Sequence, residues 1–257
     1  MADHTDQGSV AADPDDGRVR PRTHAVPQEA AREELAQRLE QVARVTLRPM
    51  ASPMPIGFIG LAGATLPLAA LNLGLIAPAE GKTIALIMLA FVFPLQATSS
   101  VFGILTRDGI TATAMGILAG TWATVGLVML TSPPGSTSDA LGLLLLVSGV
   151  AMMWPAMGAW LGKLVPATVL SVASLRFLSS GAYQLTSSVR WERITGWIGV
   201  ALGGLALYAA LAALLENVSK KTVLPMGRRQ RGRLAVEGGF TDQVVDLSHE
   251  PGVRNQL

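Results

Sequence analysis

The feature that most constrains this chain is a series of six apolar stretches, each long enough to cross a lipid bilayer as a helix. A bilayer core needs about 20 apolar residues, because each residue of an α-helix adds about 1.5 Å. Strands that span a bilayer would be about half as long and would alternate strictly. We therefore predict an all-α membrane protein, a bundle of six transmembrane helices. The stretches cover residues 56–77, 84–105, 110–130, 141–161, 166–186 and 194–215.

Charged residues are concentrated outside these stretches. Only 15% of the 257 residues are charged, whereas a soluble domain carries about a quarter. With six spans both tails lie on one side of the membrane, and that side holds most of the Lys and Arg, leaving Lys82, Arg190 and Arg193 opposite. The positive-inside rule then places both termini in the cytoplasm. We expect the plasma (inner) membrane, in the sense of a membrane whose cytoplasmic face carries both tails. Basic flanks account for the pI of 9.3 without a nucleic-acid partner.

The composition divides the chain into four parts. Residues 1–26 are polar without an apolar period and are predicted to be disordered. Residues 27–48 carry Leu35, Leu39 and Val42 at helical spacing, which predicts an amphipathic helix, either solvated or lying on the membrane surface. Residues 49–227 form the transmembrane domain. Residues 228–257 begin with a basic cluster, which either sets the topology or contacts anionic membrane lipid, and then become polar and disordered.

Arg176 is the most informative residue within the spans. An Arg at mid-span costs about 2.5–3.5 kcal/mol on insertion scales, so its side chain must face the bundle interior or a wet cavity. At about 100° per residue it shares one face of its helix with Thr168, Ser179, Ser180 and Tyr183. No Asp or Glu lies inside a span. The partner of Arg176 is therefore either a mobile anion on a substrate path or a set of carbonyls and hydroxyls in a structural role.

Prolines near the middle of three spans also favour a substrate path. Pro67, Pro94 and Pro155 each remove a backbone hydrogen bond and are expected to kink their helices. Broken helices at the bilayer midplane often line transporter sites, although proline is also common in ordinary membrane helices. Gln96 and Asn72 are the most polar residues of the second and first spans and join the predicted substrate path.

The residue inventory does not fit an enzyme. The histidines, His4, His24 and His249, all lie in the tails, and the chain has no cysteine. A Ser–His nucleophile pair therefore lacks its base within the spans, and no metal-ligating cluster or cofactor motif is present in the sequence. With no carboxylate inside a span, any proton that crosses is expected to travel on the substrate.

Three stretches of the sequence resemble the acetate uptake transporter family. Residues 52–58, Ser-Pro-Met-Pro-Ile-Gly-Phe, resemble the family signature Asn-Pro-Ala-Pro-Leu-Gly-Leu, and residues 196–199 and 222–227 resemble its closing stretch. Gln96 also falls where family members carry a Gln. The resemblance covers roughly residues 49–227, and its signature positions here are Ser52, Pro53, Pro55, Gly57 and Tyr208.

The resemblance implies a six-helix bundle with a pore through each protomer, commonly a hexamer, that passes acetate and similar small carboxylates. By alignment, Leu61, Leu118 and Ala173 occupy the positions that narrow the pore, where relatives often carry bulkier groups, so the gate is expected to be wider here. Arg176 stands where relatives are apolar, and Ala213 where relatives often carry Glu.

Two hypotheses follow from these observations. The first is a transporter or channel-like facilitator for acetate or another small monocarboxylate, with or without a proton, in a membrane-embedded homo-oligomer. The second is a non-transporting sensor or assembly subunit that keeps the bundle and uses its tails to bind partners. The buried Arg176 and its polar face favour the first, whereas the long N-terminal segment favours the second.

Overall fold

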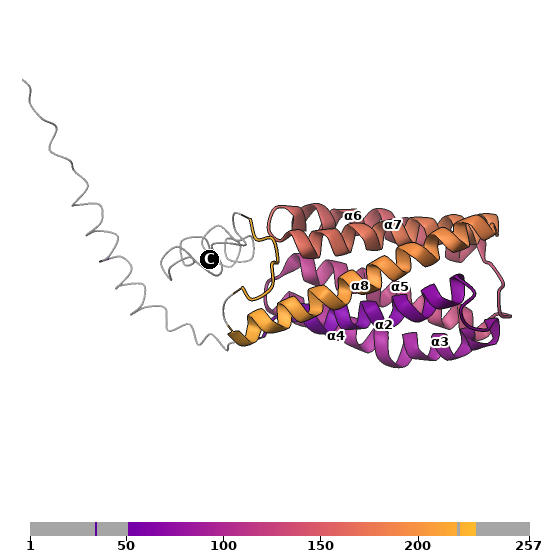
Figure 1. Cartoon of the computed structure of the whole chain (residues 1–257), viewed down its shortest axis with the longest axis horizontal. Helices are drawn as coiled ribbons and strands as arrows, with labels where there is room; N and C mark the ends of the chain where they lie inside the picture. The colour runs from indigo at the N-terminus through magenta and orange to yellow at the C-terminus, as the bar shows by residue number, and fades with distance from the viewer. Residues whose placement is uncertain (1–33, 35–50, 220–221, 230–257) are drawn as a thin grey trace, which may run out of the picture. The chain divides into compact units, whose positions relative to one another are not determined.

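The computed structural model describes residue 34, residues 51–219 and residues 222–229. Six helical segments in it are long and apolar enough to cross a membrane, which confirms the predicted architecture (Figure 1). Residues 1–26, nearly all of the predicted amphipathic helix at 27–48, and residues 230–257 of the predicted C-terminal tail lie outside the described residues. In the predicted amphipathic helix Glu34 alone is described, and it is helical. The spans are α2 (Met54–Asn72), the broken segment Pro78–Leu105, α5 (Gly109–Thr131), α6 (Asp139–Trp160), α7 (Leu164–Thr186) and α8 (Val189–Ser219).

The second span is not one continuous α-helix. It consists of η1 (Pro78–Glu80), α3 (Gly81–Ile87), a π-helical turn η2 (Met88–Val92) and α4 (Phe93–Leu105). Pro94 explains the break, because its ring would clash with the carbonyl of Ala90 in a regular α-helix, and the wider π turn relieves that clash. Pro67 and Pro155 lie inside helices that remain α throughout. Only at Pro94 does the predicted distortion change the helix type, and Pro94 itself is exposed rather than interior.

The spans form a closed ring. Each packs against two neighbours in the order α2, α8, α7, α6, α5, α4 and back to α2, and the most extensive interfaces are α6 with α7 and α2 with α8. Small residues permit this close packing. A Cβ added to Gly181 on α7 would lie 2.9 Å from the carbonyl oxygen of Gly142 on α6. The first and last spans lie side by side (Figure 1), which closes the ring.

Side-chain burial agrees with a membrane environment. Large apolar side chains such as Ile104, Leu143 and Trp154 are exposed on the outside of the bundle. A soluble protein rarely exposes so many large apolar groups together, whereas lipid tails cover them at no cost. The interior instead holds a few polar groups among apolar ones, including Gln96, Ser174, Arg176 and Thr195.

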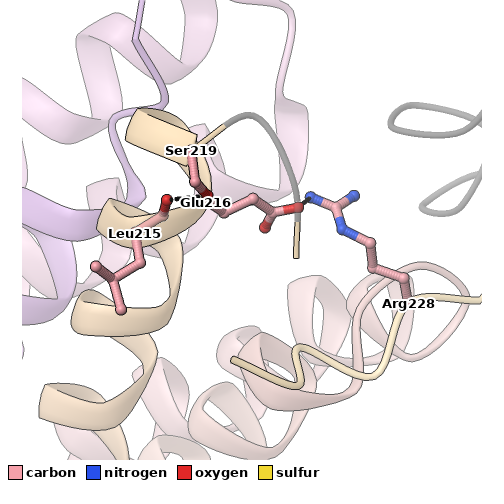
Figure 2. A network of polar contacts seen from close by, with 4 residues as sticks. All are labelled: Leu215, Glu216, Ser219 and Arg228. Carbon is pink, nitrogen blue, oxygen red and sulfur yellow. Dashed lines mark hydrogen bonds and ion pairs between the residues drawn. The ribbon is translucent and has the colours of Figure 1, made fainter. Parts of the chain in front are cut away.

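A closing segment, residues 222–229, folds back from the end of α8 onto the start of α7. The N–H groups of Leu164 and Val165 donate to the carbonyls of Gly227 and Met226, at 3.0 and 3.2 Å. The first N–H groups of a helix lack intrahelical partners, so these carbonyls cap α7. Glu216 near the end of α8 pairs with Arg228 (Figure 2), which ties the segment to the helix from which it emerges.

Candidate functional site

The three side chains predicted to narrow a pore come from alternate members of the ring. Leu61 lies on α2, Leu118 on α5 and Ala173 on α7. Each is fully buried, and all three belong to one apolar cluster. Alternate helices of a six-membered ring surround its interior evenly, so side chains buried from all three can close it. Their role as a pore constriction stays a prediction.

Two adjacent cavities occupy the end of the bundle where α2, α5 and α7 end, at the right of Figure 1. The outer cavity has a volume of about 150 Å³ and includes Lys82 and Glu192 in its wall. The inner cavity has a volume of about 60 Å³ and is lined from α2, α5, α6, α7 and α8. Because five of the six spans contribute to its wall, the inner cavity lies within the ring. The residues that line both cavities are Leu68, Asn72, Met129, Leu141, Tyr183 and Gln184.

Three residues of the predicted substrate path meet at these cavities. Asn72 and Tyr183 line both, and Ser180 lines the inner one. Asn72 comes from the last turn of α2 and the other two from the last turns of α7. The predicted polar face of α7 therefore reaches a cavity along its C-terminal half.

Three other residues of the predicted substrate path lie away from the cavities and make hydrogen bonds there. The hydroxyl of Thr168 donates to the carbonyl of Leu164 at 2.9 Å, and that of Ser179 donates to the carbonyl of Arg176 at 2.9 Å. Both are satisfied within their own helix. Gln96 is fully buried on α4, where Nε2 approaches the carbonyl of Gly57 at 3.5 Å and Oε1 has no hydrogen-bond partner among the described residues. None of the three lines either cavity.

Arg176 lies between α7 and α8 and is 1% exposed. Its Nη1 donates to the carbonyl of Thr195 at 2.7 Å, whereas Nε and Nη2 have no hydrogen-bond partner in the described part of the chain. Gly199 makes room for it, since a Cβ there would overlap Nη1. The bond to a carbonyl is one of the two arrangements expected from the sequence, and the two unpartnered nitrogens leave capacity to bind an anion.

Sequence reasoning missed two buried residues of the inner cavity wall that carry polar groups. Trp122 on α5 is 2% exposed and Thr195 on α8 is 1% exposed, and both line this cavity. The indole Nε1 and the hydroxyl Oγ1 have no hydrogen-bond partner among the described residues. An unsatisfied buried polar group costs about 1–3 kcal/mol. Trp122 also packs against Phe177, with ring centroids 5.5 Å apart. From the sequence alone, such a Trp cannot be told from an ordinary core residue.

The family-signature residues join α2 to its neighbours. The hydroxyl of Ser99 on α4 donates to the carbonyl of Pro53 at 2.9 Å, and a Cβ on Gly57 would lie 2.7 Å from that hydroxyl. Ser52 accepts a hydrogen bond from the N–H of Met54, and Pro55 occupies the first turn of α2. Later in the chain, the hydroxyl of Tyr208 on α8 donates to the carbonyl of Pro225 at 3.1 Å. These contacts indicate a packing role.

A cluster of charged groups lies at the opposite end of the bundle. Lys163, at the connection between α6 and α7, is half-buried near Arg228, Asp108 and Glu216. Burial lowers the pKa of the Lys163 ammonium, and Arg228 lowers it further, while Asp108 and Glu216 act in the other direction. Asp108 also caps α5 by accepting from the N–H of Thr111 at 3.0 Å. Within the described residues no group of His, Asp and Glu is arranged to hold a metal ion.

The arrangement resembles that of a solved membrane protein, the bacterial acetate channel SatP. The two superpose with a TM-score of 0.62 at 25% sequence identity, over 69% of this chain and 99% of that one. This chain has an acetate-channel-like fold. The likeness favours a membrane channel over an enzyme. No protein-family profile and no curated protein sequence matches the chain.

Proposed function

We propose that this protein is a channel-like transporter that passes acetate or another small monocarboxylate through the interior of its six-helix ring. The observation that carries the proposal is the closed ring with an acetate-channel-like fold, which matches nearly the whole of the solved channel. The cavities at one end of the ring support it, because they open the interior toward one face of the membrane.

The apolar groups at Leu61, Leu118 and Ala173 would control which form of the substrate crosses. An apolar constriction disfavours an ion, because the ion loses its hydration there without replacement. A neutral acid therefore passes more cheaply than its anion. The carboxylates of the observed spans, Glu80, Asp139, Glu192 and Glu216, all lie near span ends, so a proton that crosses the middle of the bundle does so on the substrate.

Arg176 would raise the local concentration of the anion before it reaches the constriction. Two of its nitrogens have no hydrogen-bond partner among the described residues, and its third holds the carbonyl of Thr195, a residue in the wall of the inner cavity. A fixed cation in a medium of low dielectric attracts an anion strongly over several ångströms. The substrate path then runs from Asn72 and Tyr183 at the outer cavity past Ser180 toward the constriction, with Gln96 beyond it.

The assembly and its placement belong to the same proposal. We infer a homo-oligomer, a hexamer by resemblance, in the plasma (inner) membrane with both termini cytoplasmic and lipid covering the exposed apolar side chains. Residues 49–227 form the transporting domain, and residues 1–26, 27–48 and 228–257 form the flanking segments. The excess of Lys and Arg on the side of the tails supports this orientation.

A second candidate function is a non-transporting sensor or assembly subunit, which the polar segment of 48 residues before the domain favours. Uptake of labelled acetate into proteoliposomes separates the two. The transporter gives saturable uptake above that of protein-free vesicles. Absence of uptake for a panel of acids from formate to succinate would contradict the transporter and favour the sensor.

A further inference from the structure

The inner cavity brings together two hydrogen-bond donors from opposite sides of the ring. Trp122 lies on α5 and Thr195 on α8, which are three places apart in the six-membered ring. Both side chains are almost completely buried, and both line this cavity of about 60 Å³. Neither the indole Nε1 nor the hydroxyl Oγ1 has a partner among the described residues.

Thr195 differs from other threonines of the spans because its hydroxyl makes no hydrogen bond within its own helix. The hydroxyls of Thr121, Thr124 and Thr168 each donate to the carbonyl four residues earlier in their own helix, at 2.7–2.9 Å. That internal bond is the usual way for a membrane helix to satisfy a threonine. Thr195 makes no such bond, so its buried hydroxyl keeps an unused hydrogen bond beside the cavity that the residue lines.

The chemistry of the wall defines what would bind. An indole N–H only donates, so its partner must be an acceptor. Arg176 bonds to the backbone carbonyl of Thr195, which places a positive charge directly behind the wall. In the part of the chain that the structure describes, no Asp or Glu lines the inner cavity. Two donors beside a fixed cation fit the oxygens of a carboxylate.

The size and the rest of the wall limit the ligand further. The volume of the inner cavity is about twice the volume that one molecule occupies in liquid water, which fits an acid of a few heavy atoms. Leu68, Leu145 and Phe177 supply apolar surface for a short alkyl group. A dicarboxylate with twice as many heavy atoms needs more room than this volume supplies.

We propose that Trp122 and Thr195 form a carboxylate-binding site in the inner cavity, which selects short monocarboxylates over dicarboxylates. This inference rests on the proposed function and specifies its substrate. The carboxylate accepts hydrogen bonds from the indole N–H and the threonine hydroxyl, Arg176 provides the compensating charge, and the alkyl group contacts the apolar wall.

The direct test is binding of ¹³C-acetate to the full-length protein in detergent, measured by NMR line broadening. Trp122→Phe keeps an aromatic ring but removes the N–H, and Thr195→Val keeps the shape but removes the hydroxyl. Each is expected to weaken acetate binding about fivefold, the effect of one lost hydrogen bond. Thr195→Ser should bind within about twofold of the native protein, because it keeps the donor. Native succinate binding should be weaker than acetate binding.

Two matched variants control for nonspecific effects. Thr124→Val removes a hydroxyl that is already bonded within α5, and Trp154→Phe alters a Trp that is 66% exposed on α6. Both are expected to bind acetate like the native protein. Native affinity in Trp122→Phe and Thr195→Val, or an equal loss in the two controls, would overturn the site.

Acetate flux into proteoliposomes distinguishes failure of the site from failure of the proposed function. Flux with an unchanged half-saturating concentration in both variants would retain the transporter and reject the site. Binding that depends on Trp122 and Thr195 without flux in the native protein would retain the site and reject the transporter. A native protein that neither binds nor transports acetate would reject both.

Discussion

Arg176 on α7 donates from Nη1 to the carbonyl oxygen of Thr195 on α8 at 2.7 Å, across the interface of two neighbouring spans. The carbonyl belongs to a residue whose side chain lines the inner cavity. A guanidinium that is 1% exposed is thereby fixed beside the proposed path with two nitrogens unpartnered among the described residues. This hydrogen bond links Arg176, the residue that is most costly to insert into a membrane, to the wall of the inner cavity.

Replacing Arg176 separates a functional from a structural role. A buried cation without an ion pair is costly, so Arg176→Met is expected to unfold at a temperature no lower than that of the native protein. Acetate flux should nevertheless fall by about tenfold, equivalent to ~1.4 kcal/mol, and Arg176→Lys should restore part of it. Thermal unfolding in detergent and flux in proteoliposomes measure the two. Lower stability with unchanged flux would make Arg176 structural.

We predict that the guanidinium of Arg176 can be accommodated only because residue 199 is a glycine. A Cβ there would overlap Nη1 of Arg176, so Gly199→Ala should destabilise the protein by about 1–3 kcal/mol. In an Arg176→Ala background the same substitution should cost less, since the overlap with the guanidinium is gone and only the contact with Cβ of Ala69 at 2.9 Å remains. Gly204→Ala, also on α8 but with nothing within 4 Å of an added Cβ, is the control. Equal costs in the two backgrounds would show that the packing at Gly199 involves other groups.

Tyr208 is expected to stabilise the closing segment rather than to act in transport. Tyr208→Phe removes only the hydroxyl that donates to the carbonyl of Pro225, so the free energy of unfolding should fall by about 1 kcal/mol. Acetate flux at a temperature where the protein stays folded should remain native. A large loss of flux with native stability would place this signature residue on the substrate path.

Lys163 should make stability depend on alkaline pH. Its pKa in the folded protein is below the ordinary value of about 10.4 because burial disfavours the ammonium, so the unfolded state binds more protons between these two values. The contribution of Lys163 to the free energy of unfolding therefore rises as pH increases from the lowered pKa toward about 10.4. Lys163→Met should abolish this rise and stabilise the protein at neutral pH. Thermal unfolding from pH 7 to 10 tests it, and a variant with the native pH profile would contradict it.

The fold was predictable because span length and hydrophobicity are set by the bilayer. The ends moved by a few residues: α2 ends at Asn72 rather than at 77, and α8 runs over Val189–Ser219 rather than 194–215. Loop residues at these ends have mixed polarity, so hydropathy does not place them sharply. Similarly, Pro94 predicted a distortion, but the π turn that accommodates it depends on backbone geometry that composition does not specify.

The candidate site was predictable only in part. Asn72, Ser180 and Tyr183 were identified by polarity on an apolar helix, and they do line a cavity. Thr168 and Ser179 have the same polarity but bond within their own helix. Trp122 and Thr195 were missed because their distinction is the absence of a hydrogen-bond partner among the described residues, which depends on the positions of other helices.

The central claim, that acetate crosses the interior of the ring, is tested most directly by narrowing the ring at Ala173. Labelled acetate uptake would be compared for the native protein, Ala173→Leu, and Ala201→Leu, which alters an exposed alanine on α8. We predict that Ala173→Leu lowers uptake at least about fivefold while Ala201→Leu does not, because only the former fills the apolar constriction. Native uptake by an Ala173→Leu protein that unfolds at the native temperature would contradict this path.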